Sequence, residues 1–504
     1  MAFEKNNFLV ARKKSLEKRE FTVECNVSTG ANVNKILTLA VEGEVSNSEV
    51  LNGVINFSGS VDTKLVFLCD DEQISSVNAN CPFSSKFESE DIETGQIAEV
   101  KVKVVDYNID SVGGDMVKIS VRLEQSGFIV GNQEIGTISC NDDCVCIKNE
   151  EIDVIKFIGA GSENITIESE INVRENIKKI LLTESSVIVK SVDSGVNFVS
   201  VTGDVVSRVL YLNENDRFES GYVYDGFKEE IELAGATRDS RVEAEAKVNR
   251  EGVMTELVQD EKGCKLLVKM PVSISVRAYD NERISVINDL YSTKGEVTAT
   301  TSSYNMTEVC PLELVEGKIE GSLTLDENSP RVDKVLFNGG NSVTITNSYV
   351  KDGEVFVEGI AKTTVVYLND ETSSLQSVVL DVPFALNDKI NCEEGALTVV
   401  DAIVCDVDVV VKKGREFYYD AKVKASVNCC HDLVSGVISE ASLQEEDRQK
   451  DYAMEIIFAP RGKDLWDIAK SARVKEEQIL SQNPEVEFPC QEDTPLVLFE
   501  QRLQ

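Results

Sequence analysis

The sequence predicts a mainly β protein, with three tandem β-sandwich-like domains followed by a small module ordered strand, helix, helix, strand. Three observations support this fold class. Landmark residues return three times in the same order, strand-like alternation dominates up to Glu440, and the composition changes after Glu440. A chain of 504 residues is also too long for one hydrophobic core.

The first landmark is a short apolar motif around a lysine. It occurs as Val33-x-Lys35-Ile36-Leu37, as Ile177-x-Lys179-Ile180-Leu181 and as Val332-x-Lys334-Val335-Leu336. A lysine here could contact another part of the molecule, or it could protect a strand edge against aggregation. The sequence leaves both open.

A glycine and two aromatic residues follow each lysine at nearly constant spacing. The glycines, 24, 24 and 25 residues after the lysines, are Gly59, Gly203 and Gly359. The first aromatic residue stands directly before a leucine, in Phe67-Leu68, Tyr211-Leu212 and Tyr367-Leu368. The second follows a Pro or Gly, at Phe83, Phe227 and Phe384. Spacings of 144 and 156 residues between the glycines indicate repeated domains. A glycine inside a strand predicts a bulge or close backbone approach, and we expect the aromatic residues to be core anchors.

Each copy has the pattern of strands and tight turns. Residues 100–105, 117–123, 272–277 and 421–427 alternate apolar and polar side chains, which buries one face of a sheet. Turn-forming pairs separate the runs, among them Asn52-Gly53, Gly113-Gly114, Glu251-Gly252, Asp352-Gly353 and Lys413-Gly414. We therefore expect a two-sheet sandwich or flattened barrel in each copy.

These patterns divide the chain into six parts. The predicted parts are an N-terminal arm at 1–20, domains at 21–150, 151–300 and 301–445, a charged linker at 446–452 and a module at 453–504. The arm carries six basic residues and no apolar core, so it does not have the pattern of a secretory signal. We expect it to be frayed or helical, or to serve as a small basic docking arm.

Composition narrows the function. The formal net charge of −37 disfavours nucleic acid and anionic membrane surfaces as partners. No segment approaches the about 20 apolar residues of a membrane span. Thirteen cysteines, an odd number in no regular framework, are expected to be mostly buried free thiols in a cytosolic protein.

The C-terminal module contains the chain's only tryptophan. A strand is expected at 454–458, a helix beginning in Gly462-Lys463-Asp464-Leu465-Trp466-Asp467-Ile468-Ala469 with Asp464 as N-cap, a second helix at 474–482 and a strand at 496–499. Leu465, Ile468 and Ala469 share one helix face and should form the small core. Trp466 lies about 100° away from Leu465 around the helix, so it could be partly exposed and anchor a partner, or it could complete the core.

This segment resembles LysM modules, whose signature is Gly-Asp-Thr-Leu-Trp-x-Ile-Ala followed by a later Asn-Pro, here Asn483-Pro484. Lys463 replaces the usual Asp, and Glu492-Asp493-Thr494-Pro495 replaces a glycine turn. LysM domains hold N-acetylglucosamine polymers between these two loops. The lost glycine and the acidic residues Glu485, Glu487, Glu492 and Asp493 make glycan binding doubtful and favour a protein ligand.

The repeated landmarks followed by a LysM-like module resemble the SipL family of spore coat morphogenetic proteins, whose repeat is the SPOCS domain. The resemblance implies a scaffold in the mother-cell cytoplasm, recruited to the outer forespore surface. In the family, the LysM domain binds the ATPase that forms the basement layer of the coat. The residues that match the signature, and are therefore expected at the partner contact, are Asp464, Leu465, Trp466 and Ile468.

An enzyme is not expected. Cys429, Cys430 and His431 are adjacent, but neighbours in a strand point to opposite faces, which makes a shared site awkward. Cys140-x3-Cys144-x-Cys146 lacks a fourth ligand at metal spacing. Phosphate-binding and dinucleotide-binding glycine motifs are absent, and no cofactor is expected. Besides the scaffold, two hypotheses remain: a cell-wall glycan binder, and a structural subunit that polymerises through its SPOCS-like domains.

Overall fold

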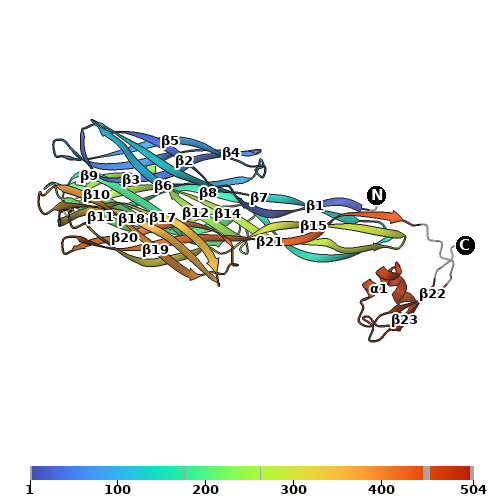
Figure 1. The fold of residues 1–504 in the computed structure, drawn as a ribbon. Coiled ribbons are helices and arrows are strands. Elements are labelled where there is room, and N and C mark those ends of the chain that lie inside the picture. The colour runs from blue at the N-terminus through green and yellow to red at the C-terminus, as the bar shows by residue number, and fades with distance from the viewer. Residues whose placement is uncertain (1–2, 174–175, 261–262, 447–453, 500–504) are drawn as a thin grey trace.

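The computed structural model describes residues 3–173, 176–260, 263–446 and 454–499 (Figure 1). The predicted fold class is confirmed, because the chain is mainly β, with three repeated pairs of sheets and a small C-terminal segment that holds two short helices. Each pair of sheets is a sandwich in which a three-stranded sheet packs against a second sheet built on one very long strand.

In domain 1, three antiparallel strands pack against the sheet of a long strand. The three strands are β3 (Val33–Leu51), β4 (Val54–Cys69) and β5 (Ile74–Glu88). The opposing sheet contains β2 (Arg19–Ser28), β6 (Ile97–Gly113) and the long β7 (Met116–Cys140). Val61, Leu65 and Phe67 of β4 are fully buried between the sheets.

Domains 2 and 3 repeat this arrangement. In domain 2, β9 (Ile177–Ser194), β10 (Phe198–Asn213) and β11 (Phe218–Glu232) face β8 (Val145–Asn172), β12 (Arg241–Val248), β13 (Met254–Asp260) and the long β14 (Gly263–Ser292). The 3-10 turn η1 (Arg250–Gly252) lies between β12 and β13. In domain 3, β17 (Val332–Lys351), β18 (Glu354–Asn369) and β19 (Leu375–Lys389) face β16 (Glu313–Thr324), β20 (Leu397–Lys412) and the long β21 (Glu416–Glu445).

The three repeated glycines occupy equivalent places on β4, β10 and β18. Each pairs with the repeated phenylalanine on the next strand: Gly59 with Phe83, Gly203 with Phe227, and Gly359 with Phe384. A Cβ on any of the three glycines would lie within 2.8 Å of the phenylalanine ring and within 2.7 Å of a backbone oxygen. A register shift on the opposite strand accompanies each glycine. The predicted close approach and bulge are both confirmed, and the phenylalanine covers the space that the glycine leaves.

Beyond the sandwiches, the long strands continue into a second body, here called the stalk (Figure 1). It contains three antiparallel strand pairs: β1 (Phe3–Ser15) with the end of β7, the first half of β8 with the end of β14, and β15 (Gly295–Val309) with the end of β21. Val10, Val154 and Val437 come from different domains and meet in the stalk core. The stalk therefore requires all three domains.

The N-terminal arm differs from the expectation. Residues 3–15 are neither frayed nor helical, because they form β1, which pairs along its own whole length with the end of β7. Val10 and Ala11 are fully buried in the stalk core, and the basic Lys13 forms a buried ion pair with Glu243.

The domain boundaries expected at 150/151 and 300/301 fall within β8 and β15. In the structure, the connections between successive domains are residues 141–144 and 293–294. Apart from Glu446, the predicted linker 446–452 lies outside the described residues.

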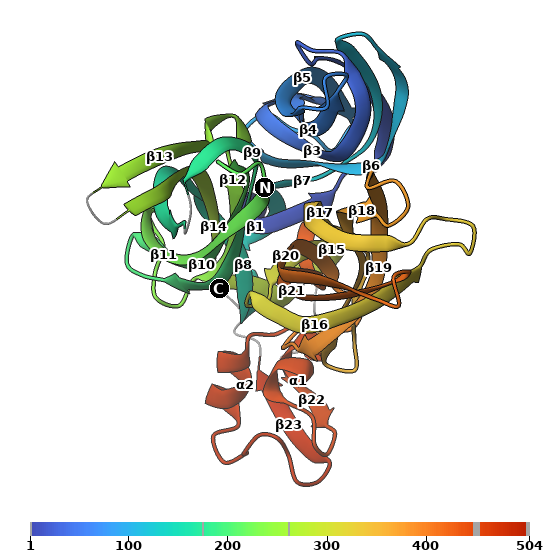
Figure 2. The same ribbon diagram turned by 90° about the vertical axis from the view of Figure 1, so that its left-hand side faces the viewer.

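The three domains are grouped around a common axis (Figure 2). An apolar ring joins them there, made of Leu37 and Val66 from domain 1, Leu181, Leu182, Leu210 and Leu212 from domain 2, and Phe337 and Val366 from domain 3.

Two of the repeated lysines lie beside this ring. Lys35 Nζ donates to the Leu375 carbonyl at 2.8 Å, and Lys179 Nζ donates to Ser75 Oγ at 3.1 Å. For these two lysines the contact hypothesis is confirmed, and the contact is with a neighbouring domain.

A buried cluster of charges, here called the ionic centre, lies where the three domains meet. Lys101 Nζ in domain 1 is 3.7 Å from Glu99, 3.0 Å from Glu245 in domain 2 and 2.7 Å from Asp401 in domain 3. Arg277 of domain 2 pairs with Glu99 at 2.8 Å and with Glu243 at 3.1 Å.

The charges of the ionic centre stabilise one another. Burial alone would raise the pKa of Glu243, but Lys13 and Arg277 outweigh it and lower that pKa to about 2. Burial alone would lower the pKa of Lys101, but the three carboxylates raise it. Removing one member would therefore leave an uncompensated charge inside the protein.

Candidate functional site: the C-terminal module

The C-terminal module has the predicted element order. Its elements are β22 (Met454–Ala459), α1 (Leu465–Ala472), α2 (Glu476–Gln482) and β23 (Thr494–Phe499), and β22 pairs with β23 antiparallel. Asp464 occupies the N-cap position of α1 with extended backbone geometry. Its carbonyl accepts the Ile468 N–H at 3.2 Å, but its side chain makes no capping hydrogen bond.

The four predicted contact residues have different surroundings. Ile468 is buried in the module core with Ala469, Ile479 and Leu496, while Leu465 is half-buried and Asp464 is exposed. Trp466 is 8 % exposed, so the partial exposure suggested by the helix geometry is not found. Trp466 belongs to the same apolar cluster as the module core, and Tyr291 on β14 of the stalk also packs against its indole ring.

The module docks on the stalk through this tryptophan. Its Nε1 donates to Asp289 Oδ2 at 2.8 Å, and its ring meets the Tyr291 ring edge-on at a centroid distance of 4.9 Å. The Tyr291 hydroxyl donates to the Val474 carbonyl at 2.8 Å, and Lys470 Nζ lies 2.6 Å from Asp289 Oδ1. Burial alone would raise the pKa of Asp289, but the hydrogen bonds from Lys470 and Trp466 lower it. The carboxylate is therefore held charged at the contact.

A second surface of the module is apolar and open. Met454, Ile456 and Phe458 alternate along β22 and are 53, 55 and 69 % exposed. Phe499 of β23, which pairs with Met454, is 51 % exposed. These four residues form the strand face, on the side of the sheet opposite the buried Leu496 and Leu498. Exposed apolar patches of this kind mark interaction surfaces.

Sequence reasoning missed the strand face, although a signal was present. In residues 454–459, Met454, Ile456 and Phe458 are apolar, and so are Ile457 and Ala459. A strand in a module this small can bury only one of its faces, so apolar residues on both faces indicate that one of them remains for a partner.

The two loops that flank the glycan in the LysM modules this segment resembles are tied to each other. The Arg461 N–H donates to Asp493 Oδ1 at 2.9 Å, and the Gly462 N–H donates to the Cys490 carbonyl at 2.9 Å. The acidic side chains of Glu485, Glu487 and Glu492 are exposed beside them. The N–H groups of Arg461 and Gly462 are thus already used within the protein.

The cysteine and histidine candidates separate in space. Cys429 lies in the core of domain 3 and Cys430 in the stalk core, and burial raises the pKa of their thiols to about 12 and about 11. His431 instead faces Cys310 and Cys392, which sequence spacing did not suggest. Among the described residues, the sulfurs of Cys140, Cys144 and Cys146 do not gather into a ligand group as these three do.

Comparison with known families adds one finding. Residues 32–112, which cover β3, β4, β5 and nearly all of β6, match the family described as "SipL, SPOCS domain". The chain contains a SipL SPOCS domain. This domain indicates a role in spore coat morphogenesis and a structural coat protein. No curated protein and no solved structure matched the chain. None of the helices in the described ranges has the length and apolar character to cross a membrane.

Proposed function

We propose that this chain is a non-enzymatic scaffold of spore coat assembly, located at the outer forespore surface in the mother-cell cytoplasm. Its C-terminal module, which resembles LysM domains, binds the ATPase of the coat's basement layer. The SPOCS match within the first of three joined sandwiches carries this proposal. The apolar ring and the ionic centre suit a scaffold, because they hold the three domains in a fixed arrangement.

The module offers the partner two surfaces. The strand face is open in the structure, whereas Trp466 and Ile468 are buried. Binding through Asp464, Leu465, Trp466 and Ile468 therefore requires the module to leave Tyr291 and Asp289 first. Either surface suits a protein partner, because both offer large apolar side chains.

Co-purification of full-length variants with the ATPase tests the proposal. Replacing Ile456 and Phe458 together by serine should reduce capture at least tenfold while circular dichroism stays unchanged, because both side chains are exposed. The matched control is Val434→Ser, an apolar residue on the stalk that is 71 % exposed. Capture unchanged in the double variant would exclude the strand face.

The second surface predicts a different pattern. If the partner binds the Trp466 side, Tyr291→Ala should increase capture by releasing the module, and Trp466→Ala should abolish it. If Tyr291→Ala, Trp466→Ala and the strand-face double variant all leave capture unchanged, the module does not bind the ATPase. Pull-down on peptidoglycan or chitin tests the glycan alternative, and particle size against concentration tests self-polymerisation.

A further inference from the structure

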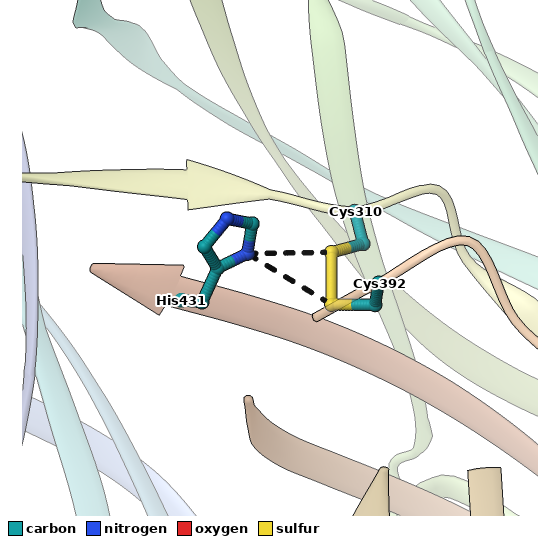
Figure 3. A group of neighbouring side chains, drawn as sticks. All are labelled: Cys310, Cys392 and His431. Carbon is teal, nitrogen blue, oxygen red and sulfur yellow. Dashed lines mark hydrogen bonds between the residues drawn. A yellow bond between two sulfur atoms is a disulfide. The ribbon is translucent and has the colours of Figure 1, made fainter. Parts of the chain in front are cut away.

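Two cysteines and the chain's only histidine lie close together where domain 3 meets the stalk (Figure 3). Cys310 follows β15, Cys392 lies between β19 and β20, and His431 is on β21. The two cysteines form a disulfide across 82 residues of sequence. His431 Nδ1 lies 3.9 Å from Cys310 Sγ and 4.0 Å from Cys392 Sγ.

The other nitrogen of His431 fixes the direction of the ring. Nε2 is 3.2 Å from the carboxylate of Glu308 and 3.8 Å from that of Glu393. Glu308 is itself held by an ion pair with Arg241. A proton on Nε2 is therefore donated to Glu308, which leaves the lone pair of Nδ1 directed at the two sulfurs. A carboxylate that orients a histidine in this way is the usual support of a metal-binding imidazole.

We propose that Cys310, Cys392 and His431 bind one Zn²⁺ ion when the disulfide is reduced. A dithiol reductant transfers two electrons and two protons to the disulfide, which opens to two thiols while the reductant closes to its own disulfide. The ion then displaces both thiol protons and is held by two Sγ thiolates and Nδ1. The oxidised form closes the same three segments by a covalent bond.

The geometry suits zinc. Zinc takes thiolate and imidazole ligands in a tetrahedron at about 2.3 and 2.0–2.1 Å, which places sulfur and nitrogen about 3.6 Å apart. The observed 3.9 and 4.0 Å therefore require only small shifts once the sulfurs separate. Cys310 is buried, but His431 and Cys392 reach the surface, so a water molecule can fill the fourth position.

Cobalt binding to the full-length protein tests the site. The protein is reduced with a dithiol, freed of it and of metal without oxygen, and titrated with Co²⁺ and then Zn²⁺. We expect one equivalent of Co²⁺ to give thiolate charge-transfer absorption, and Zn²⁺ to abolish it. The oxidised protein should give none. Cys392→Ser should lose the absorption, and Cys144→Ser, in the separate cysteine loop, should keep it.

Two further measurements do not depend on the folding of the cysteine variant. In the reduced wild-type protein, Zn²⁺ should protect Cys310 and Cys392 from alkylation, as read by peptide mass spectrometry. Glu308→Gln should weaken zinc affinity about 10–100-fold, because it removes the carboxylate that orients His431. Absence of cobalt absorption in the reduced wild type, absorption that survives in Cys392→Ser, or alkylation of both cysteines in the presence of zinc would each overturn the proposal.

Discussion

The apolar ring and the ionic centre both join the three domains, but they differ in how they use the repeat. In the ring, equivalent segments contribute Leu37, Leu181 and Phe337, so each domain brings the same chemistry. In the ionic centre, Lys101, Glu245 and Asp401 occupy equivalent places on β6, β12 and β20, each paired with a serine of the long strand. The repeat has kept the apolar contact and diversified the charged one. The ring therefore uses apolar residues that the three domains share, whereas the ionic centre uses charged residues that differ from domain to domain.

The largest expected effect is the loss of the central lysine. Lys101→Met would leave Glu245 and Asp401 without their shared cation, and should lower the free energy of unfolding by about 4 kcal/mol in urea titrations. The matched control is Lys118→Met, whose exposed ion pair with Glu24 should leave stability unchanged. Equal effects of the two substitutions would remove the distinction between the centre and the surface.

Acid should weaken the ionic centre selectively. The folded pKa of Glu243, about 2, lies below its ordinary value of 4.5, so its contribution is complete above pH 4.5 and is lost as the pH falls through about 2. The loss amounts to about 3 kcal/mol. Unfolding free energies measured from pH 5 to pH 2 should fall less steeply in Glu243→Gln than in the wild type. Parallel slopes would show that Glu243 keeps an ordinary pKa.

A somewhat smaller effect is expected in the ring. Leu37 is 1 % exposed. Leu37→Ala should lower the free energy of unfolding by about 2–3 kcal/mol, because the substitution leaves a cavity between domains. Urea unfolding at neutral pH measures it, and the effect should not change between pH 5 and pH 2. If Leu37→Ala lowered the free energy of unfolding more than Lys101→Met does, the apolar ring would contribute more than the ionic centre to holding the domains together.

Local patterns predicted the sandwiches but not the contacts between distant segments. Alternation and the Gly59–Phe83 series predicted strands, bulges and buried aromatic residues, because these depend on neighbours within one sheet. Residues 3–15 were missed because their partner is the far end of β7, more than a hundred residues away in sequence.

The site shows the same limit. The module's element order follows from capping, helical spacing and Asn483-Pro484, which are local signals. The sequence left open whether Trp466 is partly exposed or completes the core, because nothing near it in sequence indicates Tyr291 and Asp289. Cys310 and Cys392 approach His431 only through the folding of domain 3, so the sequence offered only the adjacent Cys429 and Cys430 beside it, and that grouping was set aside.

The pairing in the stalk also dictates an order of events during synthesis. The strand β1 leaves the ribosome before its partners, because the Lys13 ammonium finds Glu243 only when β12 of domain 2 has emerged, and the Lys13 N–H finds Thr307 Oγ1 only when β15 has emerged. The last long strand, β21, lies between β15 and β16, so domain 3 lacks a middle strand until residue 445 is made. A nascent chain therefore carries unpaired strand edges until β21 has emerged, and termination before that point leaves a product that proteases can readily recognise.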